Sequence, residues 1–279
     1  MVMNMKHRLT KILFGMLLVS GMTLAPLASA EICFGEEATA ITDLRSSSAA
    51  DPTGFVVLAE VVPDIVQEIR YYSTYNFVGD RIDGYTQPVA LMTREAALAL
   101  KAVSDDVKAQ GYRLKVYDSY RPQMAVDNFV RWAKKLDDKR MRPYFYPDID
   151  KSRLFPEGYI AAKSGHSRGS TIDLTLLDMR TGKEVDMGGT FDHFGIESHP
   201  DFCGNADTGQ YTGLFEGKEP EKGKLTPQQF ENRMILRQAM LRHGFKPLDE
   251  EWWHFTLANE PYPDTYFTFT VDDMRNGGK

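Results

Sequence analysis

The chain has 279 residues, a formal net charge of −6 and 42% hydrophobic residues, which is enough for one large domain with a substantial core. An acidic chain without a run of basic residues is a poor candidate for nucleic-acid binding, so this class of partner is excluded. The sequence shows no internal repeat and no low-complexity linker. We therefore expect a single folded domain at residues 31–279.

The first thirty residues have the pattern of a secretory signal peptide. Lys6, Arg8 and Lys11 precede an apolar run at residues 12–27, and Ala28-Ser-Ala30 supplies the small residues of a signal peptidase site. A membrane anchor is the alternative, but the run is short for a span and is broken by Gly and Pro. We expect a periplasmic or secreted protein that has no stable membrane association once the signal is removed.

The expected mature chain keeps two cysteines, Cys33 and Cys203. In an oxidising compartment two cysteines can pair, and a bridge here would tether the N-terminal arm to a loop near residue 203. The alternative is two unpaired thiols. Neither cysteine has the spacing of a metal ligand.

The first half of the expected domain mixes strands and helices. Phe55–Val62 and Ile65–Tyr72 are rich in β-branched and aromatic residues, which predicts extended segments. A helix capped by Thr93 is expected to run to Ala109 and to end at Gly111.

A strand and a helix follow directly. Arg113–Ser119 alternates apolar and polar residues as a strand does, and Pro122 stands where a helix can begin. The buried stripe of that helix is predicted to contain Val126, Phe129, Val130 and Ala133.

In the second half, Ser170–Leu176 is predicted as a strand, and residues 178–224 as loops around a site. Thr226-Pro-Gln-Gln229 is a helix start with a capping box, and that helix is expected to run to about His243. Glu251–Leu257 and Thr265–Val271 are predicted strands. Since no strand–helix unit repeats, we expect an α+β fold, a single domain with a mainly antiparallel central sheet flanked by helices.

His166 and Asp173 form the first candidate metal motif. His166 lies in a Gly- and Ser-rich turn that lets the chain bend, and Asp173 lies in the strand that follows. A lone histidine in a turn is usually exposed or structural. A carboxylate between Ile172 and Leu174 in a core strand, however, is costly to bury without a partner or a metal.

Glu251 and His254 form the second motif, at the start of a predicted strand. Positions three apart in a regular strand face opposite sides, so both reach one site only if the chain bends near Trp252–Trp253. Two imidazoles and a carboxylate can bind one zinc ion and leave a position open. The remaining carboxylate can then act as general base, with Glu250 as its neighbouring alternative.

Arg121, in Asp118-Ser-Tyr-Arg121-Pro122, is the third candidate. It can be an ordinary ion-pairing residue at a strand–helix junction. Its functional interpretation is stabilisation of the oxyanion that forms when water attacks a carbonyl.

These motifs together resemble the zinc site of the D-alanyl-D-alanine dipeptidases of the VanX type, which are associated with vancomycin resistance. The resemblance spans roughly residues 57–269. It is carried by Ser164-x-His166-x-x-Gly169-x-x-x-Asp173, Glu251-x-x-His254, Ser119-Tyr-Arg121-Pro, Met187-Gly-Gly-Thr-Phe-Asp192 and Ser198-His-Pro200. The chain differs from the family in two respects. It has Thr171 where many relatives have Ala, and it has an expected signal peptide, whereas the resistance enzymes act in the cytoplasm.

The resemblance implies a role for each matching residue. His166, Asp173 and His254 would bind one zinc ion per chain, Glu251 would be the base, and Arg121 would stabilise the transition state. Asp192 and Ser164 would hold the free ammonium of a small D,D-dipeptide, with Tyr85 and Tyr71 as neighbouring substrate-binding residues. Asp192 is a plausible counter-ion for that ammonium on chemical grounds as well.

The sequence therefore predicts an exported zinc metallopeptidase that hydrolyses D-Ala-D-Ala to two D-alanines. One alternative is a zinc D,D-carboxypeptidase that trims cell-wall peptides, which needs an open cleft and has no amine to anchor near Asp192. The other is a non-catalytic zinc-binding module, for which Glu251 and Arg121 would be expected to be lost.

Overall fold

The structure of this chain is a computed structural model that describes residues 50–221 and 223–275. The expected signal peptide and Cys33 lie outside the described residues, so export, the domain start at residue 31 and the bridge to Cys203 stay predictions. Cys203 itself is buried in a small cluster that also contains Phe202, Leu225, Phe230 and Met234. In the described part of the chain, no helix is long and apolar enough to cross a bilayer.

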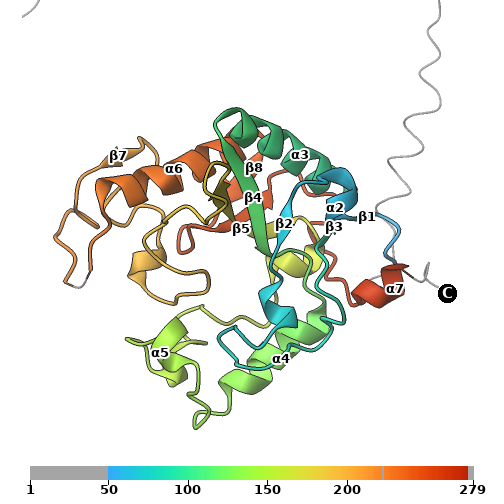
Figure 1. Ribbon diagram of the computed structural model, residues 1–279. Coiled ribbons are helices and arrows are strands. Elements are labelled where there is room, and N and C mark those ends of the chain that lie inside the picture. Colours follow the sequence, from blue (N-terminus) through green and yellow to red (C-terminus); the bar gives the residue numbers. More distant parts are fainter. Residues whose placement is uncertain (1–49, 222, 276–279) are drawn as a thin grey trace, which may run out of the picture.

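A five-stranded sheet lies at the centre of the molecule (Figure 1). Its strands follow the order β2 (Val66–Gln67), β4 (Tyr112–Asp118), β5 (Thr171–Asp178), β9 (His254–Leu257) and β8 (Phe245–Pro247). The β2–β4 pair is parallel, and the other three pairs are antiparallel. This arrangement confirms the predicted α+β fold with a mainly antiparallel sheet.

Two long helices, α3 (Arg94–Ala109) and α6 (Pro227–Arg242), lie next to each other and against the sheet (Figure 1). α3 contacts β4 and α6 contacts β8, and their apolar side chains form the main core together with those of the sheet. α4 (Gln123–Ala133) and α5 (Arg142–Phe145) lie on the opposite side of the molecule in this view.

The helix predicted after Pro122 is α4. Val126, Phe129 and Ala133 are buried as expected, and Val130 is half-buried. The apolar stripe was sufficient to predict this element because its buried residues follow helical spacing.

The predicted extended segment Phe55–Val62 is only partly correct. β1 (Phe55–Val57) is a strand, but α2 (Leu58–Val61) follows it at once. Leu58 and Val62, four residues apart, are both buried. A helical turn places residues four apart on one face, so burial rather than β-propensity decides the conformation here.

The predicted segment Ile65–Tyr72 is also shorter as a strand than expected. β2 has two residues, and the 3-10 helix η2 (Arg70–Tyr72) follows. β1 pairs with β3 (Leu91–Thr93) in a separate two-stranded sheet.

The strand predicted at Thr265–Val271 is wrong. Residues 265–270 have no strand conformation, and α7 (Val271–Arg275) begins where the prediction ended. Their alternating aromatic residues fill a second core instead of joining a sheet.

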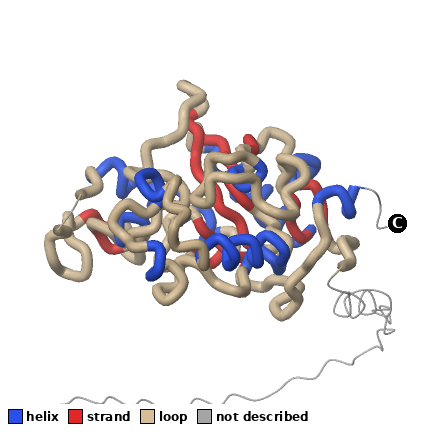
Figure 2. Tube along the Cα trace, turned by 90° about the horizontal axis from the view of Figure 1, so that it is seen from below, coloured by secondary structure: helices blue, strands red, loops and turns tan. Residues whose placement is uncertain are grey.

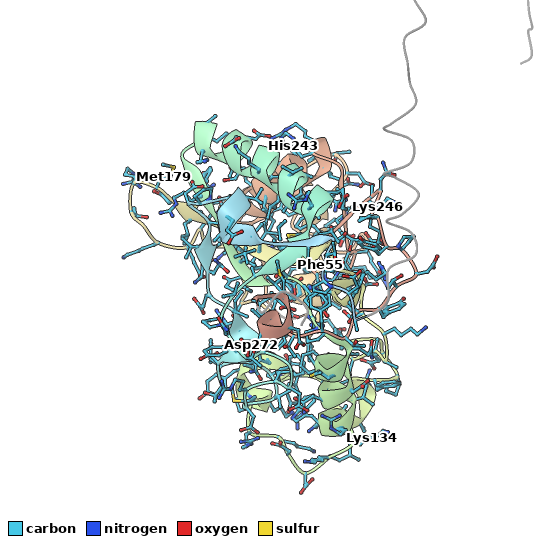
Figure 3. The ribbon with its side chains drawn as sticks, turned by 90° about the vertical axis from the view of Figure 1, so that its right-hand side faces the viewer. Phe55, Lys134, Met179, His243, Lys246 and Asp272 are labelled. Atoms are coloured by element: carbon cyan, nitrogen blue, oxygen red, sulfur yellow. The ribbon has the colours of Figure 1, made fainter. Side chains whose placement is uncertain are left out.

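This terminal aromatic cluster consists of Phe55, Tyr120, Tyr262, Phe267 and Phe269, with Leu91 and Val271. The ring centroid of Phe55 lies 4.9 Å from that of Phe267 and 4.8 Å from that of Phe269, in edge-to-face arrangements that aromatic pairs favour. Figure 3 shows Phe55 close to the helix that carries Asp272. The cluster therefore joins the first strand to the last described segment.

Much of the remaining chain is loop, as predicted for residues 178–224 (Figure 2). These loops contain only short elements: η3 (Lys151–Arg153), η4 (Gly165–Arg168), η5 (Ile196–Ser198), β6 (Gly204–Asn205) and β7 (Gln210–Tyr211). η4 leads directly into β5 and carries the candidate metal motif.

The two predicted helix caps differ in outcome. Thr93 precedes α3, but its side chain makes no capping hydrogen bond, because its hydroxyl lies 2.8 Å from that of Ser170. Thr226 caps α6 as predicted: its hydroxyl accepts a hydrogen bond from the Gln229 backbone, and the Gln229 side chain accepts one from the Thr226 backbone.

We expect Thr226→Ala to lower the free energy of unfolding by about 1 kcal/mol, because the substitution removes one capping hydrogen bond at the start of α6. Thr226→Ser is the matched control and should stay close to wild type. Urea unfolding of the three proteins measures the difference, and equal stability of the alanine and serine variants would contradict the role of the cap.

Candidate active site

Three site residues come from adjacent strands of the central sheet. In the antiparallel register, Asp118 of β4 is paired with Asp173 of β5, and Asp173 is paired with His254 of β9. A register shift between Val116 and Asp118 interrupts the β4–β5 ladder. Cross-strand partners face the same side of a sheet, so the sheet alone brings these three side chains together.

His166 reaches the same place from the turn η4. Ser164 caps this turn, and its hydroxyl accepts a hydrogen bond from the backbone of His166. Gly169 ends the turn with a φ of +83°, and a Cβ there would lie 2.2 Å from the Phe55 ring. Only glycine fits this left-handed, closely packed position, so the turn folds back and places His166 beside Asp173.

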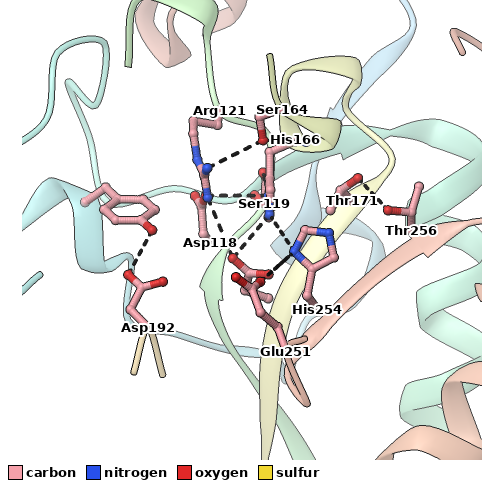
Figure 4. A network of polar contacts seen from close by, with 12 residues as sticks. Asp118, Ser119, Arg121, Ser164, His166, Thr171, Asp192, Glu251, His254 and Thr256 are labelled. Atoms are coloured by element: carbon pink, nitrogen blue, oxygen red, sulfur yellow. Dashed lines mark hydrogen bonds and ion pairs between the residues drawn. The ribbon is translucent and has the colours of Figure 1, made fainter. Parts of the chain in front are cut away.

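The ligand atoms of His166, Asp173 and His254 lie within 4.8 Å of one another. His166 Nε2 is 3.2 Å from Asp173 Oδ2 and 3.4 Å from His254 Nδ1, and His254 Nδ1 is 3.1 Å from Asp173 Oδ1 (Figure 4). This set of two imidazoles and a carboxylate could hold a metal ion. The structure brings together all three predicted ligands.

The hydrogen-bond and charge partners of His166, Asp173 and His254 favour the binding of a cation. The Ser119 carbonyl lies 2.7 Å from His166 Nδ1; if this nitrogen carries the proton, Nε2 is free to bind a metal. Burial opposes a charge on Asp173, but the two histidines hold its pKa below the ordinary range. Burial alone would lower the pKa of His254, yet contacts with Asp173 and Glu251 raise it to about 10. The centre is thus strongly negative around its imidazoles.

Glu251 lies beside this centre because the chain turns before β9. The predicted strand Glu251–Leu257 starts only at His254, whose backbone N–H donates to the Glu251 carbonyl. The expected bend near Trp252–Trp253 is therefore confirmed. Glu251 Oε2 lies 3.2 Å from His254 Nδ1, whereas Glu250 is exposed and does not line the cavity described below.

Arg121 is held in place by Asp118. Its Nε donates to Asp118 Oδ2 at 2.9 Å, its Nη2 lies 2.8 Å from the same oxygen, and its Nη1 lies 3.5 Å from Ser164 Oγ. Its guanidinium also lies over the rings of Tyr71 and Phe129, at 4.9 and 5.1 Å. The guanidinium is thus fixed close to Asp173, at 3.8 Å from its carboxylate.

Asp118 is a site residue that the sequence analysis missed. It is fully buried, and the hydroxyl of Tyr85 donates to its Oδ1 at 2.6 Å. Burial raises its pKa, against the opposing effect of Arg121. The signal was present in the Asp118-Ser-Tyr-Arg121 motif, but only the strand ending at Asp118 shows that the carboxylate turns toward the arginine.

Asp192 lies on a loop opposite the metal ligands. Its Oδ2 accepts a hydrogen bond from the Tyr71 hydroxyl at 2.8 Å, and its backbone has a φ of +62°, which non-glycine residues rarely adopt. Burial, with repulsion from Asp173 and Glu251, raises its pKa well above the ordinary value. A bound cation would offset this penalty, because it would favour the carboxylate form.

One cavity of about 310 Å³ connects these groups. Its lining includes all of the predicted site residues except Tyr85: Tyr71, Arg121, Ser164, His166, Asp173, Asp192, Glu251 and His254. Apolar side chains complete the wall, among them Phe77, Phe129, Ile160 and Phe194. The Tyr85 hydroxyl donates to Asp118, and Tyr85 does not line the cavity, so a direct contact between Tyr85 and a ligand is not supported by this geometry.

Comparison with known proteins gives a consistent result. The peptidase M15 family, described as D-Ala-D-Ala dipeptidase, matches residues 51–211 and 217–272. The chain is similar to D-alanyl-D-alanine dipeptidases of Enterococcus faecalis, with 39% identity over 218 residues, and of Streptomyces coelicolor, with 36% over 217 residues. Both alignments cover 78% of this chain and 98% of the relative. A D-alanyl-D-alanine dipeptidase of Escherichia coli is 31% identical over 208 residues, or 75% of this chain and 86% of the relative.

Proposed function

This chain belongs to the D-Ala-D-Ala dipeptidase family of peptidases, and from that premise we propose that it is an exported zinc enzyme that hydrolyses D-Ala-D-Ala to two D-alanines. The observation that carries the proposal is the shared cavity. It joins a candidate metal site, a carboxylate beside that site, a fixed arginine and a buried acidic residue on the far wall.

Zinc fits the donor set of His166, Asp173 and His254. Ligand atoms about 2.0–2.1 Å from a tetrahedral zinc ion are about 3.3 Å apart, and two imidazoles with one carboxylate are a common catalytic set. The two imidazole nitrogens are 3.4 Å apart, and the Asp173 carboxylate places Oδ2 3.2 Å from His166 Nε2 and Oδ1 3.1 Å from His254 Nδ1. Zinc bound there would supply Lewis acidity toward water and the peptide carbonyl.

The protein residues around that centre can carry out the remaining steps. The Glu251 carboxylate accepts a proton from the attacking water and returns one to the nitrogen of the leaving D-alanine. Arg121, fixed by Asp118, faces the negative charge that develops on the carbonyl oxygen. The bond that breaks is the peptide C–N bond, and the added water is divided between the two products.

Asp192 and Tyr71 favour a substrate with a free ammonium group. A charged amine that enters this cavity needs a counter-ion, and Asp192 is 5% exposed in the cavity wall. The cavity volume of about 310 Å³ is at the small end of ligand pockets, which span about 300–1,000 Å³. Both observations favour a dipeptide over the D,D-carboxypeptidase substrate, a longer cell-wall peptide without an amine at that distance.

The proposal of export rests on the sequence alone. The basic start, apolar run and Ala28-Ser-Ala30 site at the N-terminus support a periplasmic or secreted enzyme.

We predict that the protein binds one zinc ion per chain and that His166→Ala, Asp173→Ala or His254→Ala each abolishes tight binding. The physical reason is that each substitution removes one of three protein ligands. Metal analysis after gel filtration measures the stoichiometry, with His243→Ala as the matched control because this histidine ends α6 away from the site. Full zinc occupancy in the His254→Ala protein would overturn the ligand assignment.

We expect Glu251→Ala to keep its zinc and to lose turnover by about a hundred- to ten-thousandfold, the usual size of a general-base contribution. Glu250→Ala, one residue earlier and exposed, should keep the wild-type rate. Steady-state rates and zinc content of both variants are the measurement. A wild-type rate in Glu251→Ala together with a loss in Glu250→Ala would identify the other carboxylate as the base.

The substrate class is tested with D-Ala-D-Ala, its N-acetyl form and a pentapeptide that ends in the same pair. Wild type should prefer the free dipeptide, since acetylation leaves Asp192 without its partner, a loss of about 2–5 kcal/mol for a buried charged hydrogen bond. Asp192→Asn should reduce the ratio of kcat/KM for free D-Ala-D-Ala to kcat/KM for its N-acetyl form. Equal or better cleavage of the pentapeptide by wild type would favour the carboxypeptidase.

A further inference from the structure

Arg233 of α6 is a buried cation that does not line the active-site cavity. It is 1% exposed, and it donates hydrogen bonds to three backbone carbonyls. Its Nε donates to Met187 O at 2.7 Å, and its Nη1 donates to Glu197 O at 2.9 Å and His199 O at 3.0 Å. All three acceptors belong to residues 187–199, which we call the Asp192 loop.

These contacts close the base of the Asp192 loop. Met187 lies five residues before Asp192, and Glu197 lies five residues after it. One guanidinium therefore fixes both ends of the segment that presents the carboxylate. The planar fork of an arginine can hold several acceptors at once, which the point charge of a lysine does not reproduce.

The conformation of the loop needs such a constraint. Asp192 has a φ of +62°, and non-glycine residues keep such a backbone only where the surrounding structure determines it. Within the loop, the Ser198 hydroxyl donates to His193 O at 2.6 Å, and the loop residue Phe194 donates its N–H to Phe145 O, outside the loop, at 2.7 Å. The anchors on both sides of Asp192, however, meet at Arg233.

Arg233 is buried without a carboxylate in contact, as far as the described residues show. Burial lowers its pKa to about 9, so its charge is costly to keep in this place. A hydrophobic residue would avoid that cost but would remove the side-chain donor from the carbonyls of Met187, Glu197 and His199, of which His199 O also accepts from Phe202 N–H. The Asp192 loop is also linked to the segment that carries Glu251, because the N–H of Trp252, the next residue, donates to Ser198 O at 2.9 Å.

We propose that Arg233 is a positioning residue that sets substrate selectivity by holding Asp192 where it meets the substrate's ammonium group. This inference rests on the proposed function, in which Asp192 recognises a free amine. Arg233 itself contacts no substrate and acts only through the Asp192 loop.

The test compares Arg233→Met with Arg237→Met. Arg237 is the matched control: it lies four residues further along α6, is 8% exposed, and contacts Ala206 and Asp207 instead of the loop. Zinc-loaded proteins are assayed with D-Ala-D-Ala and its N-acetyl form. In Arg233→Met the ratio of the two kcat/KM values should fall about ten- to a hundredfold, since a displacement of about 1 Å can cost a hundredfold. In Arg237→Met the ratio should stay at the wild-type value.

A double variant separates positioning from general damage. In the Asp192→Asn background, Arg233→Met should change the ratio by less than about twofold, because residues that act through one interaction are not additive. An unchanged ratio in Arg233→Met, with both substrates slowed equally, would overturn the proposal. The same fall in Arg237→Met would overturn it too. If Arg233→Met does not fold, Arg233→Lys replaces it, with a smaller fall expected.

Hydrogen exchange provides a readout that does not depend on activity. Amides of residues 187–199 should exchange faster in the Arg233 variant and at the wild-type rate in Arg237→Met. Unchanged exchange in the Arg233 variant would show that Arg233 does not hold the Asp192 loop in place, even if the enzyme cleaves D-Ala-D-Ala. A different result is that the wild-type protein fails to cleave D-Ala-D-Ala while the loop exchanges faster in the Arg233 variant. That result would reject the proposed function, and Arg233 would still be shown to anchor the Asp192 loop.

Discussion

Asp173 lies in the middle of the central sheet, 2% exposed, between the fully buried Ile172 and Leu174. A carboxylate in that position is tolerated only with compensating partners, and its neighbours supply them. His254 is its cross-strand partner, and His166 is brought to it by a turn that only glycine can end. The sheet register and the η4 turn both have to be correct for this single carboxylate to be stabilised.

The charges around the cavity explain which molecules suit it. Asp118, Asp173, Asp192 and Glu251 lie around the half-buried Arg121. Arg121 is already paired with Asp118, and the remaining carboxylates repel one another: burial, together with repulsion from Asp173 and Glu251, raises the pKa of Asp192. A cation beside Asp173 and a second beside Asp192 relieve this repulsion at both ends. In the proposed function, a metal ion and the ammonium group of the substrate would therefore be complementary occupants of one acidic cavity.

Local sequence patterns predicted the parts of this protein that depend on neighbours in sequence. The capping box at Thr226 and the stripe of α4 follow from short-range rules, and both were found. The bend before His254 was expected for a different reason, because Glu251 and His254 can reach one site only if the chain bends, and it was found too. The strand predicted at Thr265–Val271 failed because alternating aromatic residues serve equally well in a side-chain cluster. Asp118 was missed because its contacts with Tyr85 and with Asp173 join residues distant in sequence, although its partner Arg121 is close by. Arg233 was missed because its backbone acceptors lie 34 to 46 positions away.

The terminal aromatic cluster has a consequence for how the molecule is made. The Phe55 ring fills the space beside Gly169, and the Phe267 backbone N–H donates to Ser167 O in the turn that carries His166. Residues more than two hundred positions apart thus support one histidine, a contact of very high sequence separation that forms slowly in folding. Before Phe267 has been synthesised, the nascent chain lacks one of the contacts that hold the turn of His166 in place. The geometry of the candidate metal site is therefore completed only after residue 267 has been synthesised.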